Sequence, residues 1–229
     1  MKLIKMALLA ALATTALPLT ANAAYVLDTD SSGGNGGNVL LSGAGFYAAE
    51  FSLSAGQTIT SIQALMGDSG TGTGQTFTVA LYSDPDGQSF TGFGGLFAAP
   101  VYDDRATYLT QNGWNGLSGL SISGLDAGNY WVAIEVGNGF GGLGSDGRGT
   151  YSWTDTATDL LLQTENAGMG TAPAEAFAWS DGGSYTTDQA LAFGVQVEVA
   201  PVPVPGALLL LGSGLFGVGG LLRRRGQAA

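Results

Sequence analysis

The feature that most limits the fold of this chain is a repeated two-residue alternation of apolar and polar side chains. It is clearest in three segments, at residues 76–82, 129–136 and 191–199. Because successive side chains of a strand point to opposite faces, the apolar side chains of each segment share one face. The three faces consist of Phe77, Val79 and Leu81; of Tyr130, Val132, Ile134 and Val136; and of Leu191, Phe193, Val195, Val197 and Val199. The alternation predicts β-strands that each bury one side.

Glycine-rich turns separate these segments from four weaker strand predictions. The weaker strands are predicted at residues 39–41, 48–53, 58–66 and 119–123, and clusters of the 39 glycines lie between the segments. The sequence Asp84-Pro85-Asp86-Gly87 matches a type I turn, with proline early and glycine late. Many short strands between turns predict an all-β domain, a single antiparallel β-sandwich that is jelly-roll-like.

A pair of smaller β-domains, divided near residues 138–150, is the alternative to one sandwich. A chain of 229 residues has room for either arrangement. We prefer one sandwich, because the last predicted strand, at residues 191–199, could close the sheet that the first strands begin.

Composition and charge exclude several classes of function. The chain has no cysteine and no histidine, which excludes disulfides, thiol nucleophiles, Ser-His-Asp catalysis and zinc sites built on these residues. Between residues 24 and 200, all 18 acidic residues are balanced only by Arg105 and Arg148, so the net charge of this part is −16 (2 − 18). Such a surface repels nucleic acid, so we exclude nucleic-acid binding, and it would attract divalent cations.

The N-terminus has the parts of a secretory signal peptide in their usual order. Lys2 and Lys5 form a basic region, and residues 6–17 form an apolar region rich in alanine and leucine. Pro18 follows, and Ala21-Asn22-Ala23 matches the small-residue pattern of a cleavage site. We predict a signal peptide at residues 1–23, export of the protein, and a mature chain that begins at Ala24.

The C-terminus combines a proline motif, an apolar run and an arginine cluster. Residues 206–222 carry no charge, and a helix of that length spans about 25 Å, close to the ~30 Å core of a bilayer. Arg223, Arg224 and Arg225 follow this run directly. Positive charge is retained on the cytoplasmic side, so the preceding domain would lie outside the cytoplasm. We predict one transmembrane helix at residues 206–222.

This order of elements resembles the PEP-CTERM sorting signal of Gram-negative bacteria. The proline motif here is Val202-Pro203-Val204-Pro205, with Val204 where the usual motif has glutamate. The resemblance covers residues 201–229 and implies an exosortase-type enzyme as a partner, which cuts near the proline motif after the helix has held the chain transiently in the inner membrane. It implies delivery to the cell surface or extracellular matrix. The departure from the usual motif at Val204 leaves open which sortase subtype recognises the signal.

The middle of the chain, residues 24–200, resembles the choice-of-anchor β-sandwich domains of exported bacterial proteins. The similarity is a loose pattern within residues 39–136, carried by segments such as Phe77-Thr-Val-Ala-Leu-Tyr-Ser-Asp and Leu125-Asp-Ala-Gly-Asn-Tyr-Trp-Val. It implies a surface domain and supplies no catalytic residues.

The four tryptophans are candidates for a carbohydrate-stacking platform. They are Trp114, Trp131, Trp153 and Trp179. Trp131 alternates with Tyr130 and so points away from the apolar face of its strand, together with Ala133 and Glu135. Packing in the core or in loops is the competing and favoured interpretation for the four rings.

Aspartates near glycine-rich segments are candidate calcium ligands. Asp28 and Asp30 precede one glycine cluster, and Asp84 and Asp86 lie within a turn. Asp103 and Asp104 are a further candidate pair. Calcium prefers six to eight oxygen ligands from a loop that wraps it, but the spacing here is not that of an EF-hand. Ordinary loop and turn positions are the favoured interpretation, so we expect no cofactor, with Ca²⁺ as the one candidate.

Paired carboxylates could also hydrolyse a glycosidic bond, although 18 acids make such pairs easy to find. No phosphate-binding glycine loop followed by lysine is present.

We therefore predict a non-catalytic exported protein with a structural or adhesive role in the cell envelope or its exopolysaccharide. The alternative function is a carbohydrate-binding module, with or without calcium.

Overall fold

The computed structural model describes two six-stranded antiparallel sheets. The described residues are 23–29, 37–42, 45–68, 70, 72–84, 100–136, 156–157, 159–164, 171–180, 185–187 and 192–201. In this part the strands are β1 (Ala24–Asp28), β2 (Asn38–Ser42), β3 (Phe46–Leu53), β4 (Ile59–Gly67), β5 (Thr76–Asp84), β6 (Tyr102–Thr107), β7 (Gly113–Ile122), β8 (Gly128–Glu135), β9 (Asp159–Gln163), β10 (Phe177–Ser180), β11 (Tyr185–Thr187) and β12 (Val195–Val199). The prediction of an all-β fold with antiparallel sheets is confirmed.

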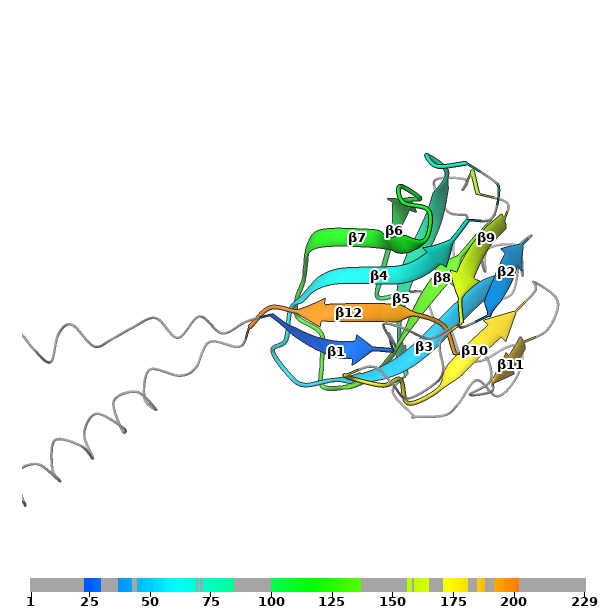
Figure 1. The fold of residues 1–229 in the computed structure, drawn as a ribbon. Helices are drawn as coiled ribbons and strands as arrows, with labels where there is room; N and C mark the ends of the chain where they lie inside the picture. The colour runs from blue at the N-terminus through cyan, green and yellow to red at the C-terminus, as the bar shows by residue number, and fades with distance from the viewer. Residues whose placement is uncertain are drawn as a thin grey trace, which may run out of the picture. The chain divides into compact units, whose positions relative to one another are not determined.

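The first sheet is built around β4. Along one edge β4 pairs with β12 and then β9, and along the other edge it pairs with β7. The sheet continues from β12 to β1 and from β9 to β2. The last strand of the sandwich therefore lies between the first strand and β4 (Figure 1).

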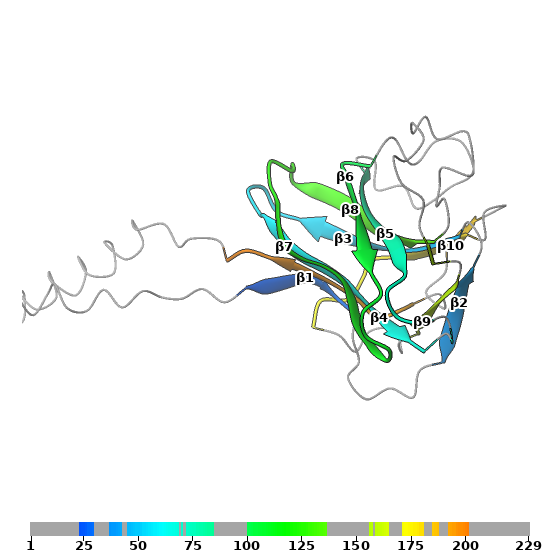
Figure 2. The same ribbon diagram turned by 90° about the horizontal axis from the view of Figure 1, so that it is seen from above.

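The second sheet has the strand order β11-β10-β3-β8-β5-β6. Strands β3, β8 and β5 lie at its centre and pair over most of their lengths. The two sheets form the two layers of a β-sandwich, which the view in Figure 2 separates. Residues from both sheets fill one continuous hydrophobic core between them.

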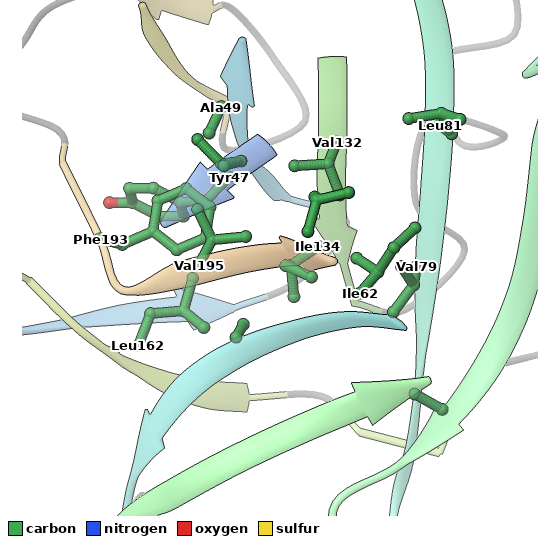
Figure 3. Close-up of a cluster of buried hydrophobic side chains, with 14 of the residues drawn as sticks. Tyr47, Ala49, Ile62, Val79, Leu81, Val132, Ile134, Leu162, Phe193 and Val195 are labelled. Atoms are coloured by element: carbon green, nitrogen blue, oxygen red, sulfur yellow. The ribbon is translucent and has the colours of Figure 1, made fainter. Parts of the chain in front are cut away.

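The core follows the alternation in the sequence. Val79, Val132, Ile134 and Val195 are fully buried between the layers (Figure 3). Phe193 lies at one side of this core and packs edge-on against Tyr47, with ring centroids 5.7 Å apart. Burying side chains of this size contributes about 1.5–3 kcal/mol each, so the alternating faces hold the two sheets together.

Two predicted strands have clearly different bounds in the structure, and β1, β6, β9, β10 and β11 have no counterpart among the predicted strands. The strand predicted at residues 191–199 begins only at Val195, because the chain before it makes irregular backbone contacts. There Gly194 donates to the carbonyl of Gln163 and accepts from the amide of Leu65. The strand predicted at residues 119–123 is part of the longer β7, whose first half was not predicted.

Candidate functional site

Trp131 lies on the outer face of the second sheet, opposite Tyr130, but it is only 2% exposed. Its ring packs in a second hydrophobic cluster with Phe46 and Tyr82. Four alanines in register across β10, β3, β8 and β5 leave room for these rings to lie on the sheet; they are Ala178, Ala48, Ala133 and Ala80. The indole Nε1 donates to Asp84 Oδ2 at 3.0 Å, so the ring is held as a packed residue.

The other tryptophans have different surroundings. Trp179 on β10 packs against the main core, with its ring centroid 6.3 Å from that of Tyr47. Trp153 lies outside the described residues. Trp114 on β7 is partly exposed and lies on the outer face of the first sheet. Of the predicted stacking residues that the structure describes, Trp114 is the one that remains partly open without packing against the core.

Asp28, a candidate calcium ligand, forms hydrogen bonds with residues 171–172 and with β12. Its Oδ2 accepts a hydrogen bond from the Thr171 hydroxyl at 2.5 Å, and its Oδ1 accepts one from Gln196 Nε2 at 3.0 Å. Its backbone also forms an isolated bridge with Ala172. Asp28 thus joins β1 and β12 to the chain near residue 171.

Asp84 accepts a hydrogen bond from Trp131, and Asp103 and Asp104 lie on β6, opposite Ala80 and Val79 of β5. Asp30 and Asp86 lie outside the described residues. Within the described ranges, no group of three or more acidic side chains is arranged to hold a metal ion. Asp28 and Asp84 therefore belong to no such group among the residues that the structure describes.

A group of carboxylates that the sequence did not single out lies beside Asp84. Glu50, which is 6% exposed, accepts a hydrogen bond from Asn129 Nδ2 at 3.1 Å. The same amide nitrogen lies 3.3 Å from Glu175 Oε2, and the Ser52 hydroxyl also donates to Glu175. Burial raises the pKa of Glu50; the Asn129 hydrogen bond lowers it, and the nearby charges of Asp84 and Glu175 raise it further.

Replacing Glu50 with glutamine is expected to stabilise the domain at neutral pH. The folded state disfavours ionised Glu50. The free energy of unfolding therefore falls as the pH rises from the ordinary glutamate pKa through the raised one. Glutamine keeps the acceptor for Asn129 and removes the charge. Thermal unfolding of both proteins from about pH 4 to about pH 8 should show a difference that grows with pH. A glutamine variant less stable than wild type at neutral pH would contradict this explanation.

The outer face of the first sheet carries an apolar stripe, which consists of Trp114, Leu65, Leu161 and Leu40. Trp114 lies directly opposite Leu65, and Leu161 lies directly opposite Leu40. Leu161 also covers Gly67, two residues beyond Leu65 on the same face of β4. The stripe therefore runs from β7 through β4 and β9 to β2.

The neighbours of the stripe residues point into the core. Asn115, Ala64, Leu160, Leu162 and Leu41 are each at most 3% exposed, whereas Trp114, Leu65 and Leu161 are partly exposed and Leu40 is 55% exposed. None of the four stripe residues packs against the main core within the described part of the chain. Strand alternation accounts for this, because each stripe residue alternates with a buried one.

The described strands begin and end, in the sequence, close to the two predicted sorting segments. The compact unit comprises Ala23–Ala200. β1 begins at Ala24, the predicted first residue of the mature chain, and Ala24 pairs with Val199 at the end of β12. Ala21 of the predicted cleavage site lies outside the described residues. So do all residues of the predicted sorting motif, which are Val202, Pro203, Val204, Pro205, Arg223, Arg224 and Arg225.

The described ranges contain no helix with the length and apolar character needed to cross a membrane. The transmembrane helix predicted at residues 206–222 lies outside those ranges. Comparisons of the chain with protein-family models, curated proteins and solved structures find no match. We therefore infer the function from the residues themselves.

Proposed function

We propose that this chain is a non-catalytic exported protein with a structural or adhesive role in the cell envelope or its exopolysaccharide. A signal peptide directs export, and an exosortase-type enzyme recognises the C-terminal signal. The domain between them is a single jelly-roll-like sandwich, held transiently at the inner membrane by the helix at residues 206–222. After processing, it resides at the cell surface or in the matrix.

The observation that carries this proposal is the agreement between the ends of the folded unit and the two predicted cleavage positions. β1 starts at Ala24, and β12 ends at Val199, three residues before Val202 of the proline motif. Figure 1 shows the start of β1 beside the arrowhead of β12. Removal of either terminal segment would leave every described strand complete.

The last backbone contact of the sandwich also precedes the proline motif. The amide of Ala200 donates to the carbonyl of Thr58 at 2.8 Å, which fixes the chain just beyond β12. Proline at 203 and 205 disfavours helical backbone in the residues before it, so the motif supplies extended chain for a protease. A cut there would release a folded domain.

Mass spectrometry of the protein extracted from the cell surface tests the proposal. We expect a chain that begins at or close to Ala24 and ends within Val202–Pro205 when an exosortase-type enzyme is present. Without that enzyme, the C-terminal segment should remain attached and the protein should stay with the inner membrane.

Two arginine variants provide a matched control. Replacing Arg223, Arg224 and Arg225 with glutamine removes the charge that sets the orientation of the helix, so processing should fall strongly. The matching lysine variant keeps the charge and is expected to keep the orientation. Recovery of an intact arginine cluster on wild-type protein at the cell surface, with the enzyme present, would refute the proposal.

A further inference from the structure

The apolar stripe is a partly exposed patch whose four residues do not pack against the main core within the described part of the chain. Its four side chains come from four strands and lie side by side on the outer face of the first sheet. A single exposed leucine is common on protein surfaces, but a patch that is continuous across several strands marks a binding surface. Trp114 provides the aromatic ring of this patch, with Leu65 directly across from it.

Amide side chains accompany the stripe on the same face. Gln63 lies two residues before Leu65, and Gln163 lies two residues after Leu161. Asn38 lies directly opposite Gln163. None of these three amides makes a side-chain hydrogen bond within the described part of the chain, so each has donors and an acceptor available for a ligand.

The charges of the molecule decide which partner fits this face. The domain carries a net charge of −16 (2 − 18) between residues 24 and 200, but the stripe and its three amides are uncharged. The acids of this face lie at its margins: Glu198 opposite Ser61 on β4, Asp159 at the start of β9, and the buried Asp28 on the edge strand β1. An anionic polymer would be repelled, whereas a neutral polymer with hydroxyl groups and apolar ring faces complements both the amides and the stripe.

We infer that the apolar stripe and its amides bind a neutral polysaccharide. Sugar rings would stack on Trp114 and lie along Leu65 and Leu161, and their hydroxyl groups would pair with Gln63, Gln163 and Asn38. This inference supplies the chemistry of the adhesive role under the proposed function. It concerns the folded domain alone, so it stands or fails independently of whether the C-terminal signal is cut.

The test measures binding of the full chain, kept soluble in a non-glycosidic detergent, to four polysaccharides. Three are neutral (cellulose, dextran and galactomannan), and alginate is the anionic comparison. We expect retention by at least one neutral polymer and none by alginate. Trp114→Ala should weaken that retention about tenfold or more, which corresponds to the loss of one stacked ring, and Gln63→Ala should weaken it less.

Val101→Ala is the matched control, because Val101 is 43% exposed and lies on the second sheet, where its amide donates to the carbonyl of Leu81. Its binding should equal that of wild type, and circular dichroism should show all three variants folded. Failure of folded wild type to bind any of the neutral polymers would overturn the inference, as would equal binding by Trp114→Ala or retention by alginate alone. None of these results depends on whether the C-terminal signal is cut, so failure of this inference can be told apart from failure of the proposed function.

Discussion

Replacing Gly116 with alanine is expected to destabilise the sandwich by more than about 3 kcal/mol. Gly116 lies in β7 directly opposite Gln63 of β4. A Cβ atom at this position would lie 2.2 Å from the carbonyl oxygen of Ile62 and 2.8 Å from Cα of Gln63. Both atoms belong to the backbone, so no side-chain rotation relieves the overlap and β7 would have to separate from β4.

Gly119→Ala is the control for this substitution, since Gly119 lies on the same strand. No atom lies within 4 Å of a Cβ built there, and its φ of +71° imposes only the conformational cost of a left-handed residue, about 1–2 kcal/mol. Urea unfolding of the two variants should therefore give clearly different midpoints. Equal destabilisation would show that the close approach of β7 to β4 does not control stability. Because Trp114 precedes this contact by two residues, Gly116→Ala should also disturb the apolar stripe.

The strands with clean alternation could be predicted from the sequence, as could the weaker patterns of β2, β3 and β4, but β1, β6, β9, β10 and β11 could not. β5 and β8 carry large apolar side chains at every second position, and both lie where the alternation places them. β9 is a continuous leucine run and β6 is mostly polar, so neither shows the two-residue period. β6 forms because Ala106 and Tyr102 contact the core while the whole strand pairs with β5 at the sheet edge. Tertiary pairing, which is absent from a local pattern, decides such strands.

The candidate site residues could likewise be predicted only in part, because a local sequence pattern does not contain the pairing of distant strands. Alternation places Trp131 on the outer face of β8, but its burial depends on packing with residues of other strands, among them Phe46 and Tyr82. The apolar stripe depends on strand register, since Leu65 and Trp114 are far apart in the sequence and Leu40 meets Leu161 only through the pairing of β2 with β9. The two-residue alternation predicts which face of its own strand a residue occupies. Strand register determines which residues of the neighbouring strands lie beside it on that face.

Replacing Asn115 with aspartate is expected to destabilise the domain by about 3–5 kcal/mol. Asn115 is 3% exposed, and its side chain organises the turn between β6 and β7 through four hydrogen bonds. Oδ1 accepts from the amides of Leu109 and Thr110, at 2.8 and 2.9 Å. Nδ2 donates to the carbonyls of Thr110 and Gly113, at 2.8 and 2.9 Å. Aspartate has the same shape but would turn a buried carboxylate oxygen toward those two carbonyls.

The same substitution at Asn112 is the matched control, because Asn112 is exposed in the same turn. Its φ of +51° suits aspartate as well as asparagine, so Asn112→Asp should change stability by less than about 0.5 kcal/mol. Burial would raise the pKa of an aspartate at 115, so the stability of that variant should recover as falling pH protonates it. Thermal unfolding of both variants across a pH series measures this. Equal stability of the two variants at neutral pH would mean that the turn does not depend on the Asn115 amide.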